Sequence, residues 1–208
     1  MTISLSEAGK RFNRDWIFRD FNYQFESGHQ YAITGPNGSG KSTLLQILGA
    51  SMMLNKGRID YTMDGKSLSS EKVYQYAGIC APYLELIEEM TLMEFLEFHL
   101  QFKPLLDNIS IRDIADQLSL SNAMDKQIRY YSSGMKQRVK LAQCIFFDCS
   151  LLLLDEPCTN LDEAGVQIYH QLIQRYCLDR LLVVSSNDET EYRFCEERIN
   201  ITAYKGDY

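Results

Sequence analysis

Two short apolar runs in the second half of the chain, at residues 151–154 and 181–184, lie on either side of a helical pattern at residues 163–176. A strand that is apolar at every position has both faces buried, as happens in a parallel sheet covered by helices on both sides. Strand–helix–strand is also the unit from which such sheets are built. The chain is therefore predicted to be an α/β protein with a mostly parallel sheet.

The rest of the sequence divides into a strand-rich start and a helical middle. Strands are expected at 2–5, 16–25, 30–34, 59–63 and 73–80, and helices from Lys41 onward and at 92–100, 109–120 and 135–147. The early strands predict an N-terminal antiparallel β subdomain, and residues 84–131, approximately, predict an α-helical insertion. No repeat or linker interrupts the chain, so residues 1–208 are expected to form a single domain.

The strand predicted at 30–34 is followed by GPNGSGKST, residues 35–43, which matches the phosphate-loop pattern G-x-x-x-x-G-K-S/T. Gly35, Gly38 and Gly40 permit backbone conformations that a side chain would forbid, so successive N–H groups can point into one concavity. A helix begins directly after the loop, and its N-terminus favours anions. The segment therefore predicts a nucleotide-phosphate site.

Three side chains at the end of this loop supply the remaining chemistry. Lys41 adds a positive charge that can reach the β- and γ-phosphates, the Ser42 hydroxyl can bind Mg²⁺, and Thr43 can bind phosphate beside it. The predicted ligands are ATP and Mg²⁺. The predicted nucleotide-binding residues here are Gly35, Pro36, Asn37, Gly38, Ser39, Gly40, Lys41, Ser42 and Thr43.

Two adjacent carboxylates follow the first apolar run, in LLLLDEP, residues 151–157. The strand would carry Asp155 to the carboxyl edge of the sheet, where α/β proteins place their ligands. Asp155 is predicted to complete the Mg²⁺ shell with Ser42. Glu156, on the opposite side of the chain, is predicted to orient and polarise the attacking water.

Between these two motifs lies YSSGMKQR, residues 131–138, which resembles the LSGGQ-type signature of ATP-binding cassette (ABC) transporter nucleotide-binding subunits. The run after the carboxylate pair, residues 157–162, resembles the D-loop of that family. Ser132 is a good N-cap, and the helix that follows presents a positive dipole end. The resemblance implies a P-loop NTPase core, in which Ser132, Ser133 and Gly134 meet the γ-phosphate of ATP held by another subunit.

The resemblance also implies partners and an adenine contact. A dimer is expected with a second copy or a related cassette subunit, and a membrane-spanning permease is expected as a separate chain. Phe12 lies 29 residues before Lys41, where the family commonly stacks an aromatic ring on adenine, and Trp16 is the alternative. The implied location is the cytoplasm, at the inner face of the cell membrane through the permease.

Two positions depart from the family pattern. Its Q-loop glutamine aligns with Pro82, or with Tyr83 after a shift of one residue, and neither has an amide side chain. Its switch histidine aligns with Asn187, a shorter, uncharged candidate catalytic group. Hydrolysis is therefore expected to persist through Glu156 but to run slowly. The remaining histidines are expected to be surface or helix residues outside the catalytic site: His29, His99 and His170.

The net charge and the lengths of the apolar runs narrow the functions that this chain can have. A net charge of −7 argues against a general nucleic-acid binder, and no nucleic-acid partner is expected. No apolar run reaches the roughly 18–20 residues of a membrane-spanning helix. The main interpretation is a transport ATPase subunit. The alternatives are a weakly hydrolysing or non-hydrolysing regulatory cassette and a soluble cassette ATPase outside transport.

Overall fold

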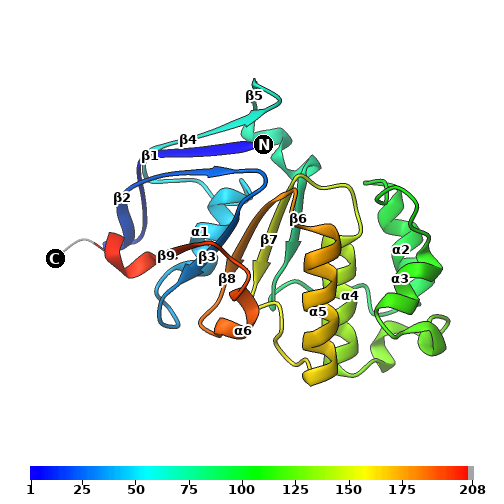
Figure 1. Cartoon of the computed structure of the whole chain (residues 1–208). Helices are drawn as coiled ribbons and strands as arrows, with labels where there is room; N and C mark the ends of the chain where they lie inside the picture. Colours follow the sequence, from blue (N-terminus) through cyan, green and yellow to red (C-terminus); the bar gives the residue numbers. More distant parts are fainter. Residues whose placement is uncertain (206–208) are drawn as a thin grey trace.

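The computed structural model describes residues 1–205 and contains a parallel and an antiparallel sheet with helices packed around them (Figure 1). The parallel sheet has five strands in the order β6-β7-β8-β3-β9, and every neighbouring pair is parallel. This arrangement confirms the α/β prediction. The strands are β3 (Gln30–Thr34), β6 (Ala77–Cys80), β7 (Leu151–Asp155), β8 (Leu181–Ser185) and β9 (Glu197–Asn200).

The second sheet is antiparallel, has the order β2-β1-β4-β5, and confirms the predicted N-terminal β region. Its first two strands are longer than the sequence pattern indicates, because they continue as one hairpin past several register shifts. The strands are β1 (Thr2–Phe12), β2 (Asp15–Glu26), β4 (Lys56–Met63) and β5 (Lys66–Leu68).

Every α-helix except α1 begins at a side chain that caps it. Thr91 and Ser110 each form a capping box, Ser132 caps the signature helix, and Asp162 caps the helix after the D-loop. Residues 81–132 contain no strand of either sheet. The helices are α1 (Lys41–Leu48), α2 (Leu92–Leu100), α3 (Ile111–Gln117), α4 (Ser133–Ile145), α5 (Glu163–Tyr176) and α6 (Glu189–Tyr192), with 3₁₀ turns η1 (Ser70–Gln75), η2 (Ser121–Ala123), η3 (Ile128–Tyr130) and η4 (Ile201–Tyr204).

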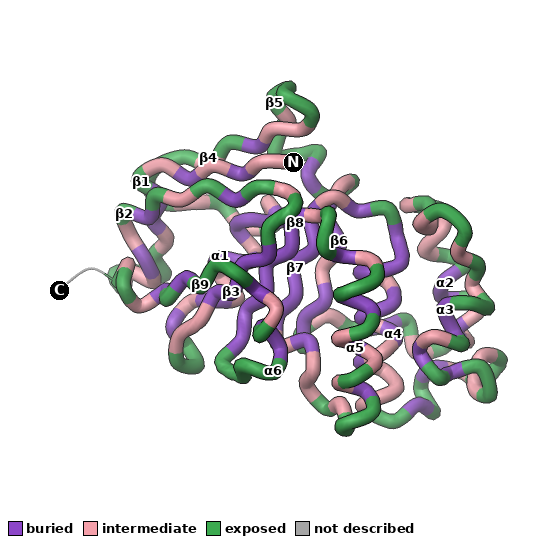
Figure 2. Tube along the Cα trace, viewed as in Figure 1, coloured by how far each residue is buried: buried purple, intermediate pink, exposed green. Residues whose placement is uncertain are grey.

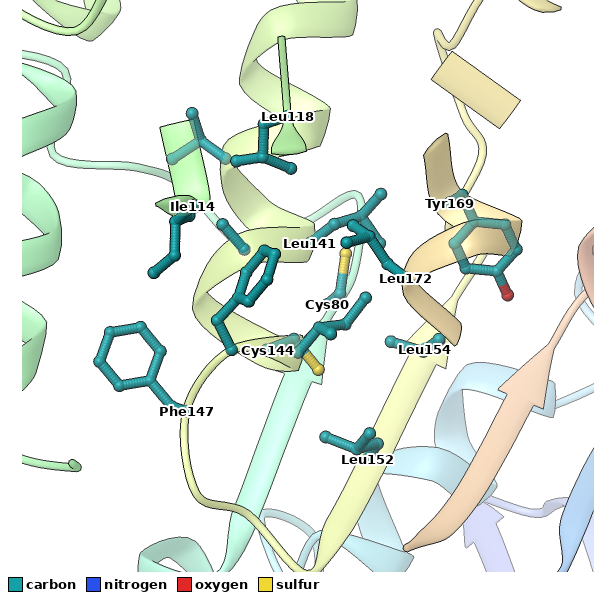
Figure 3. Close-up of a cluster of buried hydrophobic side chains, with 14 of the residues drawn as sticks. Cys80, Ile114, Leu118, Leu141, Cys144, Phe147, Leu152, Leu154, Tyr169 and Leu172 are labelled. Atoms are coloured by element: carbon teal, nitrogen blue, oxygen red, sulfur yellow. The ribbon is translucent and has the colours of Figure 1, made fainter. Parts of the chain in front are cut away.

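The parallel sheet separates two hydrophobic cores, and this explains why β7 and β8 are apolar at every position except their last residues. Leu152 and Leu154 of β7 pack with helices α2 to α5, whereas Leu151 and Leu153 pack with α1 and the antiparallel sheet. Figure 3 shows Leu152 and Leu154 facing the first core, with Cys80 and Cys144 beside them. The central strands are buried along their length in Figure 2. All six cysteines are free, and all but Cys158 are buried.

One predicted strand, at residues 73–80, is partly wrong. Residues Ser70–Gln75 form the 3₁₀ turn η1, and the strand begins only at Ala77. Valine and two tyrosines favour a strand by propensity, but Val73 alone is buried in this turn while Tyr74 is exposed. Within residues 1–205 no helix has the length and apolar character needed to cross a membrane.

Candidate functional site

The phosphate loop joins β3 to α1, and three of its glycines have positive φ angles. The values are 143° at Gly35, 77° at Gly38 and 105° at Gly40. A Cβ atom at Gly40 would lie 2.1 Å from Cγ2 of Ile17, and one at Gly35 would lie 2.8 Å from Oγ of Ser39. Glycine is therefore required at Gly35 and Gly40 for both its conformation and its size.

Lys41 is the first residue of α1, and its side chain folds back over the loop. Nζ donates hydrogen bonds to the carbonyl oxygens of Gly35 at 2.8 Å and Pro36 at 3.4 Å. Lys41 is buried, as is the Oγ of Ser39, which has no hydrogen-bond partner among the described residues. A buried cation and a spare hydroxyl beside backbone N–H groups form a donor set suited to phosphate oxygens.

A cavity of about 300 Å³ lies in front of this loop. It brings together the loop, the first turn of α1, one of the two carboxylates and an aromatic ring. Its lining residues are Phe12, Ile17, Asn37, Gly38, Gly40, Lys41, Ser42, Thr43 and Glu156.

The two aromatic candidates for an adenine contact differ in position. Phe12 lines the cavity, is 46% exposed, and has Nζ of Lys10 at 5.3 Å from its ring centroid. Trp16 is not a lining residue of this cavity, and its ring lies 5.6 Å from the Arg11 guanidinium. Of the two, only Phe12 borders the cavity.

The two predicted carboxylates lie at the end of β7. Asp155 is 4% exposed, and its Oδ1 is buried with no hydrogen-bond partner in the described part of the chain. Burial of an unpaired carboxylate oxygen is costly unless a cation or a donor meets it. An all-oxygen set of Asp155 and the Ser42 hydroxyl fits Mg²⁺.

Glu156 has a different environment from its neighbour. Its φ of 45° is in the left-handed region, and its N–H donates to the Ser185 carbonyl oxygen at 2.9 Å. This bond ties the residue to the end of β8, and Glu156 lines the phosphate-loop cavity. The pair is therefore divided, with Asp155 in the sheet and Glu156 at the cavity.

Asn187 lies just after β8 and touches the phosphate loop. Its Nδ2 donates a hydrogen bond to Oδ1 of Asn37 at 3.0 Å. Asn37, Glu156 and Asn187 also line a second cavity of about 370 Å³ beside the first. The structure thus brings these three residues, predicted from distant segments, into one neighbourhood.

The signature residues lie at the N-terminus of α4. Oγ of Ser132 accepts the N–H of Met135 at 3.2 Å, and both Ser132 and Ser133 are exposed. A Cβ atom at Gly134 would lie 2.9 Å from the carbonyl oxygen of Asn160, so only glycine lets the two segments approach this closely. None of the three signature residues lines the phosphate-loop cavity of the same chain.

The two candidates for the Q-loop position follow β6. Pro82 offers only its carbonyl oxygen, which accepts a hydrogen bond from Nζ of Lys140 at 3.0 Å. Tyr83 is half exposed. Burial raises the pKa of Tyr83, hydrogen bonding with the Gln46 side chain lowers it, and the nearby charge of Asp155 raises it. Either residue leaves this position without an amide side chain.

The three histidines are distant from the phosphate-loop cavity. His29 is half exposed, with Nδ1 3.8 Å from Glu196 Oε2. His99 packs edge-on against Phe147, with a centroid separation of 4.4 Å, and burial lowers its pKa. His170 lies in α5, and none of the three lines the cavity.

Two buried polar residues near the site were not predicted from the sequence. Gln137 in α4 donates from Nε2 to the Pro157 carbonyl oxygen at 2.7 Å. Glu191 in α6 accepts the N–H of Cys158 at 2.7 Å. Gln137 lies inside residues 131–138 but after the part that matches the signature pattern, which ends at Met135, and Glu191 lies four residues after Asn187, so neither was singled out.

A family model described as ABC transporter matches residues 18–159, which contain the phosphate loop, the signature and the carboxylate pair. This chain belongs to the ABC transporter family. The matched span is more than half of the 208 residues, and the predicted resemblance is confirmed.

Curated ABC relatives have modest sequence identity. The ABC transporter ATP-binding protein YhcH of Bacillus subtilis is 28% identical over 207 residues, covering 96% of this chain and 66% of its own length. YybJ of the same organism is 30% identical over 172 residues, covering 82% of this chain and 78% of its own. The chain therefore spans just under two thirds of the first relative.

Solved ABC structures share the fold. A putative ATP-binding protein of an ABC transporter from Pyrococcus furiosus superposes with a TM-score of 0.82 at 20% identity, covering 99% of this chain and 100% of its own. The bacterial ABC transporter cassette MJ0796, in its dimeric form, gives 0.79 at 23% identity, covering 96% and 94%. These likenesses confirm the P-loop NTPase architecture of the ABC cassette.

Proposed function

We propose that this chain binds ATP with Mg²⁺ and hydrolyses it as the nucleotide-binding subunit of an ABC transporter. The single observation that carries the proposal is the cavity shared by the glycine loop, Lys41, Ser42 and Glu156. In this proposal residues 1–208 act as one ATP-binding unit with a helical insertion at about 84–131. Names of the relatives support it, since YhcH and YybJ are ATP-binding proteins of ABC transporters.

Each residue in this proposal has one task. The backbone N–H groups of the loop and the Lys41 ammonium neutralise the β- and γ-phosphates. Ser42 and Asp155 hold Mg²⁺, which when bound neutralises the charge that develops on the phosphate oxygens. Glu156 orients the water that attacks the γ-phosphate, and Phe12 stacks on the base.

The proposed assembly is a dimer. Ser132 and Ser133 are exposed at a helix N-terminus, and neither they nor Gly134 line their own chain's nucleotide cavity. A second copy or a related cassette would bring that positive helix end to the γ-phosphate. Closure of this dimer on ATP would drive a separate membrane-spanning permease. Contact with the permease would place this subunit at the inner face of the cell membrane.

We further propose that turnover is slow. At the Q-loop position Tyr83 or Pro82 replaces an amide, and the switch position carries neutral Asn187. Phosphoryl transfer depends on positioning and charge stabilisation, so a weaker donor slows it without abolishing it.

The test is ATP binding and phosphate release by the purified chain, with any copurifying permease. We expect Mg²⁺-dependent ATP binding that Lys41→Ala weakens by at least about tenfold, and turnover that Glu156→Gln abolishes while ATP still binds. Absence of Mg²⁺-dependent ATP binding, with no effect of Lys41→Ala, would overturn the proposal.

The same assays separate the alternatives. A regulatory cassette would bind ATP and dimerise, but wild type and Glu156→Gln would release phosphate equally slowly. A soluble cassette ATPase would turn over without copurifying a membrane chain. Copurification of a multi-span membrane protein is the result expected for the transport subunit.

A further inference from the structure

Glu191 is a buried carboxylate for which the phosphate chemistry above gives no role. It lies on α6, is 4% exposed, and forms no ion pair with any cation among residues 1–205. Burial raises the pKa of Glu191, hydrogen bonds from Ser186 and Cys158 lower it, and the charges of Asp188 and Glu156 raise it. Burying a carboxylate without a cation costs free energy, so the hydrogen bonds of Glu191 are expected to have a structural or functional role.

Glu191 is hydrogen-bonded to two segments. Its backbone is bonded to α5, and its side chain is bonded to the D-loop. Its carbonyl oxygen accepts a hydrogen bond from the Tyr169 hydroxyl at 2.8 Å, and Tyr169 is fully buried in α5. Its carboxylate Oε1 accepts the backbone N–H of Cys158 at 2.7 Å. Glu191 therefore links the D-loop to a fully buried residue of the core.

The segment that Glu191 holds is the turn 156–161, which contains the catalytic carboxylate. The Glu156 carbonyl oxygen accepts the N–H of Thr159 at 3.1 Å, and that of Cys158 accepts the N–H of Leu161 at 2.9 Å. A left-handed φ of 45° at Glu156 is unfavourable for a residue with a Cβ atom. Such a conformation persists only where surrounding contacts determine it.

This turn also reaches the signature. The Asn160 carbonyl oxygen would lie 2.9 Å from a Cβ atom at Gly134, so the two backbones are in close contact. The same six residues thus contact the core through Glu191, the cavity through Glu156 and the signature helix through Asn160. A small displacement at Cys158 would move both ends of the turn.

We propose that Glu191 is a positioning residue for hydrolysis: its carboxylate oxygen fixes the Cys158 N–H, and so holds the turn 156–161 and the direction of Glu156. The inference rests on the proposed function, because it concerns the hydrolysis step at the same site. Glu191 touches neither nucleotide nor water in this mechanism, and acts through the turn.

Three variants separate the effect of side-chain length at residue 191 from the effect of its charge. Glu191→Gln keeps an oxygen at the same distance, and should retain kcat within about twofold. Glu191→Asp keeps the charge but is one methylene too short for Cys158, and should lower kcat by about tenfold to a hundredfold with little change in KM for ATP, as misplaced groups do. Glu189→Ala is the matched control, since Glu189 is an exposed α6 carboxylate paired with Arg198 at 2.9 Å, and it should leave kcat unchanged.

A second measurement needs no turnover. Amide hydrogen exchange of Cys158 in the intact protein should be slow in wild type and Glu191→Gln, and at least about tenfold faster in Glu191→Asp. Fast exchange of this amide in wild type overturns the inference even if a variant fails to fold. Wild-type kcat in Glu191→Asp, or a loss in Glu191→Gln as large as in Glu191→Asp, overturns it as well.

The two proposals fail in distinguishable ways. A wild-type chain that neither binds nor hydrolyses ATP refutes the proposed function, whatever the exchange of the Cys158 amide. A wild-type chain that turns over, with Glu191→Asp equally active, refutes only the role of Glu191.

Discussion

Asn187 gives the site an uncharged donor where the family resemblance leads one to expect histidine. Its amide is already engaged with Asn37 of the phosphate loop at 3.0 Å, so it must leave that bond or share it in order to reach a phosphate oxygen. A hydrogen bond from a charged donor is roughly twice as strong as one between neutral groups. The neutral side chain therefore limits how far the transition state is stabilised.

Asn187→His should raise kcat by roughly two- to tenfold with little change in KM, because a longer, protonatable ring can reach and stabilise the developing charge. The gain should shrink as pH rises above about 6.5, where an ordinary histidine loses its proton. Steady-state phosphate release across pH 6–8 is the measurement. Asn187→Ala is the control, and equal turnover in the histidine variant and wild type would contradict the idea that Asn187 limits the rate.

The candidate site residues that can be proposed from the sequence are those that belong to a short, specific pattern. The glycines and Lys41 of the phosphate loop, and the Asp155–Glu156 pair, are adjacent in the chain and specific in type. Glu191 and Gln137 were missed because their partners, Cys158 and Pro157, lie 33 and 20 residues away, and the contacts are made to backbone atoms that any residue would present.

Helix α2 shows how an element's start can be fixed by its own residues. Oγ1 of Thr91 accepts the N–H of Glu94 at 3.2 Å, and Oε2 of Glu94 accepts the N–H of Thr91 at 2.8 Å. The helix then buries Leu92, Phe95 and Leu96 against the first core. The predicted range 92–100 agrees with the observed one, because both the cap and the apolar spacing are local.

Thr91→Ala should lower the free energy of unfolding by about 1 kcal/mol, since it removes the cap of α2 without touching the nucleotide cavity. Urea unfolding at neutral pH measures the difference. Thr91→Ser keeps a hydroxyl in the same place and should cost much less. An alanine variant as stable as wild type would show that α2 is held by packing alone.

The same capping box should also affect how the free energy of unfolding changes at low pH. The pKa of Glu94 is lowered, first by the hydrogen bond from the Thr91 backbone and then by the one from its side chain. A lowered folded-state pKa means that this contribution is complete above the unfolded value of 4.5 and is lost as pH falls through the lower folded value. Glu94→Gln removes the titrating group and should therefore lose less stability than wild type on acidification below about pH 4.5, measured by urea unfolding at pH 3 and pH 7.

Residues 73–80 show where local patterns stop being informative. Val73 at the first position has the character of a strand residue, yet its neighbours Tyr74 and Gln75 are exposed, and only Ala77–Cys80 pair with β7. Where β6 begins depends on how far β7 extends beside it. That length is a property of the sheet and has no signature in the segment itself.

The arrangement of the whole chain separates the two halves of the proposed ATP site. The loop and Glu156 share one cavity, whereas Ser133 lines another cavity of about 340 Å³ with Lys136, Gln137 and Asn160. Because Ser133 and the phosphate loop line different cavities of one copy, the proposed dimer is what would bring both to the same nucleotide. Ser133 is exposed at the helix end that this partner's phosphate would approach.

Ser133→Glu should abolish ATP-dependent dimerisation while leaving the folded monomer as stable as wild type. A carboxylate in the first turn of α4 suits the helix dipole, but it repels a γ-phosphate brought by another subunit. Size-exclusion chromatography with light scattering, in a Glu156→Gln background with ATP, measures the dimer. Ser133→Gln is the isosteric control and should weaken the dimer far less; an undiminished dimer in Ser133→Glu would contradict the composite site.

The two-sided packing of β7 restricts how its sequence can change. Consecutive leucines of this strand belong to different layers, and Asp155 comes directly after the last of them. Inserting or deleting a single residue would exchange the side chains of the two layers and turn the terminal carboxylate to the other face of the sheet. Exchange of leucine for isoleucine changes only shape, and exchange for valine removes one methylene as well. Homologues should therefore vary freely in which branched aliphatic residue stands at each place, while the number of residues before the aspartate stays constant.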